Sequence, residues 1–259
     1  MALTGEKKQY DDVATDYKSY DDLPMARLEA ELIRTALGDC TDLAILDLGG
    51  GSGTHARQAV RAGSRLADVV DISEAMMQIG KDLASRTSEA SHIRWHVADA
   101  SRPLGDQGIQ LLPPGEYDVV LANWVFDHAH TEDDLRGMWR NIATYLKPGG
   151  RFVGIRVIGP GIWAEHVKTG KYGAAYEDIA PIPGGVRCKV TLRTDPPFSF
   201  GGTMMRDSYE MVNSIPTEFG MTDFKTVPAE EADIVKGDME FWKEHLTEPL
   251  FAVVTAIKI

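Results

Sequence analysis

The stretch Leu43-Ala-Ile-Leu-Asp-Leu-Gly-Gly-Gly-Ser-Gly53 decides the fold class. A short apolar run that ends in glycines is typical of a buried strand followed by a tight turn. Residues 54–62 then have the spacing of a helix, which Gly63 ends. Glycines just before a helix N-terminus let a ligand approach the backbone closely. The stretch therefore predicts the first strand–helix unit of an α/β fold, with a ligand site at its turn.

Strand and helix patterns alternate through the rest of the first half. Apolar runs predict strands at the following ranges: 68–71, 93–97, 117–122 and 151–157. Helical spacing covers 74–84, with Ser73 as N-cap, and 135–146, which ends at Lys147-Pro-Gly-Gly150. This alternation predicts a mostly parallel sheet.

The second half is less regular. Its patterns predict a strand over 186–193, a hairpin near 196–202, a helix over 208–219, and strands at 224–227 and 251–259. We expect one domain over residues 1–259. It would carry an N-terminal helical cap (1–40) and an insertion after the fifth strand (159–205).

Composition narrows the function classes. The 259 residues include 27 Lys and Arg against 39 Asp and Glu, a formal net charge of −12, which opposes binding to a nucleic-acid backbone. Two cysteines exclude a disulfide scaffold. No apolar run approaches the ~20 residues of a membrane span, and the polar N-terminus lacks a secretory h-region. We expect a cytoplasmic protein that acts on a small molecule, without a nucleic-acid or membrane partner; the oligomeric state is left open.

The charge of the residues near the glycine turn favours one class of ligand over another. Gly51-Ser-Gly-Thr-His-Ala56 loosely fits the dinucleotide fingerprint G-x-G-x-x-A. Asp47, however, ends the strand just before the glycines, where it would repel a pyrophosphate. S-adenosylmethionine carries an ammonium and a sulfonium instead of phosphates, which an acidic neighbourhood favours. An NAD(P)-dependent oxidoreductase and a turn without ligand remain as alternatives.

Two further carboxylates end strands of the predicted sheet. Asp71 follows the second strand, 18 positions after Gly53, where it can accept the two hydroxyls of a ribose. Asp99 follows the third strand and can accept the amine of an adenine. All three acids would lie at the carboxyl edge of the sheet, where open α/β folds bind ligands.

In this order, the motifs resemble the class I S-adenosylmethionine-dependent methyltransferases of the small-molecule type, similar to ubiquinone and glycine N-methyltransferases. The resemblance covers residues 8–160 and includes the turn Leu146-Lys-Pro-Gly-Gly150. It implies a Rossmann-like, doubly wound sheet of seven strands, mostly parallel, with one antiparallel strand near the C-terminus. It also implies S-adenosylmethionine as cofactor and S-adenosylhomocysteine as product. The cofactor-binding residues that it implies are Tyr17, Arg27, Asp47, Gly49, Gly50, Gly51, Asp71, Ile72, Met76, Asp99, Ala100, Asn123 and Trp124.

The N-terminal segment resembles the Tyr/Phe-Asp-x-x-Ala-x-x-Tyr opening of the same enzymes, from Tyr10 to Tyr17. The resemblance implies that Tyr17 shields the methionine end of the cofactor and that Arg27 pairs with its carboxylate. A surface arginine on an amphipathic helix is the alternative for Arg27, and helix core is the alternative for Ile72 and Met76.

Methyl transfer is an in-line displacement that needs alignment and, for a hydroxyl or protonated amine, removal of a proton. We expect His128, after the fourth strand, to be the general base, because its ordinary pKa lies near neutrality. The alternative is a histidine that packs under the loop. Asp127 and His130 lie beside it, but no further ligands follow at metal spacing, so we expect no metal.

The insertion should recognise the acceptor, which we expect to be a secondary or specialised metabolite methylated at O or N. Aromatic side chains suit a flat acceptor or an ammonium. The residues expected on the acceptor are Trp163, His166, Tyr172, Tyr176 and Phe200. A satellite core under a long loop is the alternative for them. A cofactor-binding module without turnover is the remaining alternative for the whole chain.

Overall fold

The computed structural model describes residues 2–14 and 16–259. In this part of the chain seven strands form one sheet in the order β3-β2-β1-β4-β5-β10-β9. Only β10 runs against its parallel neighbours, pairing antiparallel with β5 and β9, which confirms the predicted sheet. The strands are β1 (Ala44–Leu48), β2 (Leu66–Asp71), β3 (Ile93–Val97), β4 (Tyr117–Asn123), β5 (Leu146–Val157), β9 (Met221–Thr226) and β10 (Phe251–Lys258).

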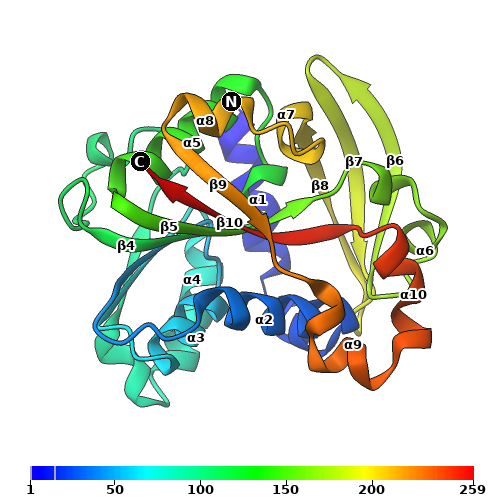
Figure 1. Cartoon of the computed structure of the whole chain (residues 1–259), viewed down its shortest axis with the longest axis horizontal. Helices are drawn as coiled ribbons and strands as arrows, with labels where there is room; N and C mark the ends of the chain where they lie inside the picture. The colour runs from blue at the N-terminus through cyan, green and yellow to red at the C-terminus, as the bar shows by residue number, and fades with distance from the viewer. Residues whose placement is uncertain (1, 15) are drawn as a thin grey trace.

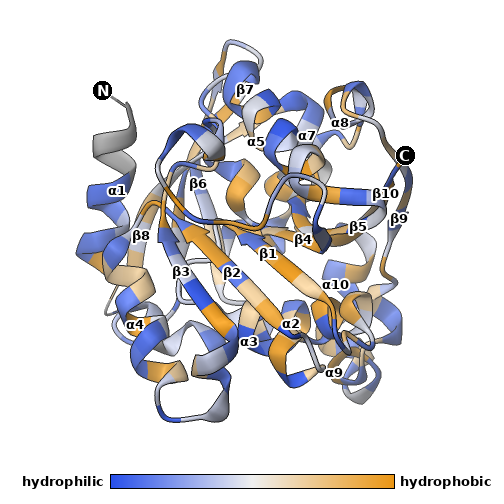
Figure 2. Cartoon of the chain, turned by 90° about the vertical axis from the view of Figure 1, so that its left-hand side faces the viewer, coloured by the Kyte–Doolittle hydropathy of each residue, from blue (hydrophilic) through white to orange (hydrophobic). Residues whose placement is uncertain are grey.

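Helices cover both faces of this sheet (Figure 1). On one face lie α2 (Pro24–Leu37) and α3 (Thr54–Arg61), whose apolar sides pack on residues such as Ile45 and Val153. On the other face lies α5 (Glu132–Tyr145), where Trp139 stacks on Phe126. Figure 2 shows apolar strands β1 and β2 at the centre of the molecule. Burial on both sides explains why these strands are continuously apolar.

The remaining helices lie around the ends of the sheet. They are α1 (Ala2–Val13), α4 (Glu74–Ala84), α6 (Glu165–Lys168), α7 (Arg206–Tyr209), α8 (Ser214–Glu218), α9 (Asp233–Gly237) and α10 (Met239–Thr247). A 3-10 segment, η1 (Asp16–Asp22), joins α1 to α2. In the described part of the chain, no helix has both the length and the apolar character needed to cross a membrane.

A second, antiparallel sheet fills much of the expected insertion. It consists of β6 (Ala174–Ile182), β7 (Gly185–Leu192) and β8 (Phe198–Met205), and it rises beside one end of the main sheet (Figure 1). Strand β6 was not expected, and Gly201-Gly202 lies inside β8 rather than in a turn.

The single helix expected over residues 208–219 is wrong. The chain instead forms α7 and α8, separated by Met211 and Asn213 at φ 55° and 60°. The buried Arg156 side chain binds the carbonyl oxygens of Asp207 and Ser208 at 2.8 and 2.7 Å. The Asp207 carboxylate then accepts the backbone N–H of Ser214 and so begins α8. These tertiary contacts end one helix and start another.

Candidate active site

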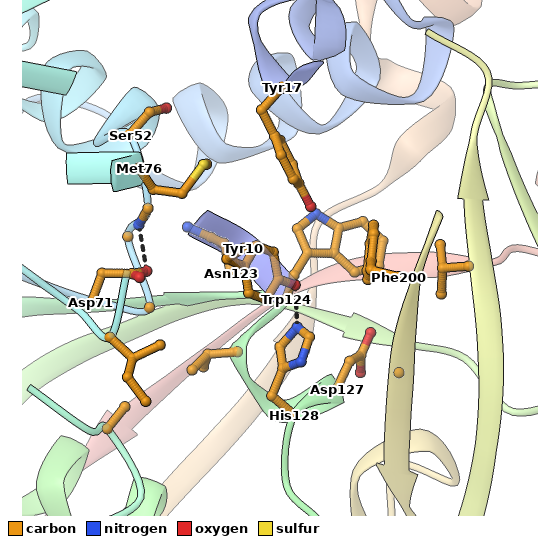
Figure 3. A pocket seen from close by; sticks show the side chains of 18 of the residues that line it. Tyr10, Tyr17, Ser52, Asp71, Met76, Asn123, Trp124, Asp127, His128 and Phe200 are labelled. Atoms are coloured by element: carbon orange, nitrogen blue, oxygen red, sulfur yellow. Dashed lines mark hydrogen bonds between the residues drawn. The ribbon is translucent and has the colours of Figure 1, made fainter. Parts of the chain in front are cut away.

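One cavity of ≈ 270 Å³ lies at the carboxyl ends of β1, β2, β3 and β4. The turns after these strands form one side, and α1, η1 and the second sheet close the other. Figure 3 shows Asp71, Met76 and Ser52 at one end and Asp127, His128 and Phe200 at the other. The cavity therefore connects the expected cofactor site with the side chains that β6–β8 contribute.

The glycine turn is held in a conformation that other residues rarely adopt. Gly49, Gly51 and Gly53 have φ values of 66°, 54° and 71°. A Cβ on Gly50 would lie 2.8 Å from Cγ of Asp47, whose carboxyl is buried beneath the turn. No described residue forms a hydrogen bond with this carboxyl, and burial raises its pKa to about 7. The turn thus presents backbone to the cavity, with a carboxyl group directly below it.

Asp71 and Asp99 have the hydrogen-bonding capacity that a nucleoside requires. The two oxygens of Asp71 accept the backbone N–H groups of Gly51 and Ser73, each at 2.8 Å, which leaves further lone pairs for hydroxyls. Asp99 Oδ1 accepts both the N–H and the hydroxyl of Ser101. Asp99 Oδ2 is buried, receives no hydrogen bond from the described residues and lies 3.6 Å from Nε of Arg102. These carboxylates line the cavity and fit S-adenosylmethionine, a cofactor with a ribose and an adenine amine.

The turn after β4 brings two more of the expected residues to the cavity. Asn123 Oδ1 accepts the N–H of Ile155, and its Nδ2 has no hydrogen bond within the described chain. Trp124 has a left-handed backbone, φ 61°, and its Nε1 donates to Glu29 Oε2 at 2.8 Å. The other expected residues that line the cavity are Tyr17, Ile72, Met76, Ala100, Tyr176 and Phe200.

His128 lies in the cavity, half-buried, and its Nε2 is 2.7 Å from the hydroxyl of Tyr10 (Figure 3). Helix α1 carries Tyr10 and touches both ends of the site. Asp11 accepts the hydroxyl of Ser73 at the start of α4. Gln9 exchanges two hydrogen bonds with the backbone of Gly201 in β8. Helix α1 therefore spans the cavity from the cofactor end to the second sheet. Residues 1 and 15 of the expected cap lie outside the described residues.

Arg27 does not reach the cavity, which corrects that expectation. Its side chain is 59% exposed and lies 3.8 Å from a carboxylate oxygen of Asp22. Position 29 of the same helix faces inward instead, where the buried Glu29 accepts hydrogen bonds from Tyr20 and Trp124. Burial raises the pKa of Glu29 to about 8. The sequence analysis did not predict that Glu29 is buried in the site. The signal was the position of Glu29 among the apolar residues of an amphipathic helix.

Three residues expected on the acceptor lie elsewhere. Trp163 is 45% exposed and packs against Tyr209. Tyr172 stacks on Trp242 of α10 with ring centroids 4.8 Å apart, and His166 meets the edge of Tyr172. The satellite-core interpretation describes His166 and Tyr172. The reason is that β6 starts only at Ala174, so the segment before it packs on α10 rather than over the site.

The sequence reasoning also missed side chains of the second sheet and the role of Asp127. Asp127 ends the short turn after β4, lines the cavity and is 9% exposed. Burial raises its pKa to about 7. Opposite it, β7 and β8 contribute mostly apolar groups: Cys188, Val190, Leu192, Gly202 and Met204. Alternation along β7 was the signal for Cys188, Val190 and Leu192, since every second side chain of a strand faces one side.

Comparison with known proteins agrees with this geometry. Residues 45–150 match the family model of a methyltransferase domain. The ubiquinone/menaquinone biosynthesis C-methyltransferase UbiE of Ectopseudomonas mendocina is 31% identical over 120 residues. That alignment covers 45% of this chain and 43% of the relative, so less than half of each protein is compared.

Solved structures show the same fold over most of the chain. A putative S-adenosylmethionine-dependent methyltransferase from Listeria monocytogenes has a TM-score of 0.60 at 16% identity, over 90% of this chain and 98% of that one. A geranyl diphosphate C-methyltransferase from Streptomyces coelicolor, solved with S-adenosylhomocysteine, has a TM-score of 0.55 at 17% identity, over 90% and 76%. At these identities the likeness concerns the fold.

The family match, the strand order and the cavity together define a class I S-adenosylmethionine-dependent methyltransferase domain. The family model covers residues 45–150, which is less than half of the chain.

Proposed function

We propose that this protein transfers a methyl group from S-adenosylmethionine to an O or N atom of a small-molecule acceptor, with His128 as general base. The observation that carries the proposal is the continuity of one cavity from Asp71 to His128. A cofactor whose ribose is held by Asp71 and whose methionine end lies near Trp124 would direct its methyl toward His128. An in-line displacement requires the enzyme to hold the acceptor atom close to the methyl carbon and in line with the carbon–sulfur bond.

The side chains around His128 support its role. Its hydrogen bond with Tyr10 holds the imidazole in one orientation. The ring of Phe200 lies 6.5 Å away, centroid to centroid, and helps to exclude water from the reacting atoms. A proton that leaves the acceptor during transfer would pass to this imidazole.

Two variants test the proposal. His128→Asn should lower kcat by about 10²-fold or more, the usual contribution of a general base, without weakening S-adenosylhomocysteine binding. Tyr10→Phe should lower kcat less, because the imidazole remains and only its orientation is relaxed. Radiolabelled S-adenosylmethionine with metabolite extracts supplies the assay, and calorimetry supplies the affinity.

The oxidoreductase alternative gives the opposite binding result. If NAD binds the wild-type protein and S-adenosylhomocysteine does not, the proposal is wrong. Undiminished turnover by His128→Asn would instead leave methyl transfer intact and remove the general base.

A further inference from the structure

The cavity is rich in acidic side chains and poor in cations. Seven carboxyl groups line it: Asp21, Glu29, Asp47, Asp71, Asp99, Asp127 and Asp134. In the described chain, Arg102 is the one Lys or Arg side chain on its wall, and it lies 3.6 Å from Asp99 and 3.8 Å from Asp134. An acceptor with a phosphate or carboxylate group would therefore meet repulsion from several sides.

Most of these carboxyls already have partners or lie at the cofactor end. Asp71 and Asp99 accept backbone N–H groups beside the glycine turn. Glu29 accepts from Tyr20 and Trp124. Asp127 differs, because no described residue donates a hydrogen bond to its carboxyl, although it is 9% exposed. Figure 3 shows this carboxyl beside His128, on the side toward Phe200 and away from Asp71. Among the described residues this buried carboxyl has no hydrogen-bond donor, and the charged groups that act on it are His128 and Arg156.

Aromatic rings border the same end. Tyr10 and Phe200 lie 5.7 Å apart and Tyr17 and Phe200 lie 6.3 Å apart, centroid to centroid. Tyr176 of β6 also lines the cavity, and burial, together with the nearby Asp127, raises the pKa of its hydroxyl. Ring faces are negative, so they attract an ammonium and repel a carboxylate. A carboxyl group and several aromatic rings around one space form a binding environment for a cation.

We propose that the acceptor is an amine, bound as its ammonium by the Asp127 carboxylate and the rings of Tyr10, Tyr176 and Phe200, and methylated at nitrogen. This inference rests on the proposed methyltransferase function and names its substrate class. The inference favours a nitrogen acceptor over an oxygen acceptor. The Asp127 carboxylate can neutralise the charge of an ammonium, whereas a hydroxyl carries no charge to neutralise.

The chemical step balances with the side chains present. The bound ammonium gives one proton to the imidazole of His128, which leaves a neutral amine with a lone pair. This lone pair forms a bond to the methyl carbon while the carbon–sulfur bond breaks, and its electron pair stays on sulfur. The products are a methylated ammonium, a neutral thioether and a protonated His128, which returns its proton to water.

Burial affects Asp127 in the direction that favours this ligand. Burial disfavours the charged form of Asp127 and raises its pKa to about 7, although His128 and the guanidinium of Arg156 act in the opposite direction. An ammonium in contact with the carboxylate would favour the charged form and lower that pKa again.

The first test compares ligands of equal shape and opposite charge on the wild-type protein. The probes are 2-phenylethylamine against phenylacetate, and tryptamine against indole-3-acetate, titrated by calorimetry into protein saturated with S-adenosylhomocysteine. We expect each amine to bind at least about tenfold more tightly than its carboxylate, as for a charged hydrogen bond. Equal or tighter binding of the carboxylates, or no binding of either amine, would overturn the inference.

The second test assigns the preference to Asp127. Asp127→Asn should remove the preference for amines while leaving S-adenosylhomocysteine affinity unchanged. Asp133→Asn is the matched control, because Asp133 is an exposed acid at the start of α5 and should keep the preference. If Asp127→Asn retains the preference, Asp127 is not the partner. If the wild-type protein does not bind S-adenosylhomocysteine, the proposed methyltransferase function itself is wrong. If it binds S-adenosylhomocysteine but shows no preference for amines, only the inference about the acceptor is wrong.

Discussion

At the scale of single residues, Asp71 joins the glycine turn to the expected ribose site. Its carboxylate accepts N–H groups from Gly51 and from Ser73, so it positions the turn after β1 and the start of α4 together. The same two oxygens face the cavity. The hydrogen bonds give the carboxylate a structural role, and we propose a cofactor-binding role for it at the same position.

Replacement of Asp71 tests the binding role. We expect Asp71→Ala to weaken S-adenosylhomocysteine binding by about 1–3 kcal/mol, the cost of losing charged hydrogen bonds. Calorimetry measures the change, and circular dichroism checks the fold. Asp82→Ala is the control, because Asp82 is an exposed acid of α4, the helix that follows Asp71 in the chain. Equal affinities for the two variants would remove Asp71 from the cofactor site.

At the scale of elements, α1 is held to the rest of the site mainly by polar contacts. Asp11 reaches the start of α4, Gln9 reaches β8, and Tyr10 reaches His128. Figure 2 shows a largely hydrophilic α1 at the margin of the molecule, near α4 and β8. An element with little apolar burial opens at low free-energy cost. We therefore propose that α1 and the second sheet form a lid over the acceptor.

Two neighbouring aspartates separate lid anchoring from helix stability. Asp11 bonds to Ser73, whereas Asp12 pairs with Lys8 within α1 at the surface. We expect Asp11→Ala to speed hydrogen exchange in α1, and Asp12→Ala to change it little. In the wild type, S-adenosylhomocysteine should slow exchange in α1 and η1. If the ligand slows exchange only in the glycine turn, α1 does not act as a lid.

At the scale of the whole molecule, buried carboxyl groups link stability to pH. Burial raises the pKa of Glu29 to about 8 and those of Asp47 and Asp127 to about 7, above the ordinary values near 4. Between these limits the folded state binds more protons than the unfolded state. The free energy of unfolding attributable to these groups should therefore fall as pH rises from about 4 to about 8.

Glu29 provides the test of this linkage. In the absence of ligand, Glu29→Gln should show a smaller loss of Tm between pH 5 and pH 8 than the wild type, because the amide does not titrate. Glu240→Gln changes an exposed acid and should follow the wild-type curve. Parallel curves for all three proteins would show that Glu29 titrates normally in the folded state.

The first half of the chain shows how much of the fold was predictable. Strands β1 and β2 are buried on both faces, so local apolar runs were sufficient to predict them. Asp71 and Asp99 were placed on the cavity because parallel strands end at a common edge. In contrast, the helix predicted over residues 208–219 was wrong, because Arg156, which lies far away in the sequence, binds the backbone carbonyl of Asp207 where α7 ends.

By itself, the sequence determined the class of fold and most of the residues that line the cavity at the expected cofactor end. These features depend on residues that are close together in the sequence: a strand, a turn with positive φ, and an acid at the end of the strand. Only the tertiary structure decided the acceptor half. Asp127 meets the wall of β7 and β8 across more than sixty residues of chain, and Tyr10 meets His128 across 118. It also placed Glu29 inside and Arg27 outside, because which face of α2 is buried depends on the elements packed against it, not on the helix alone.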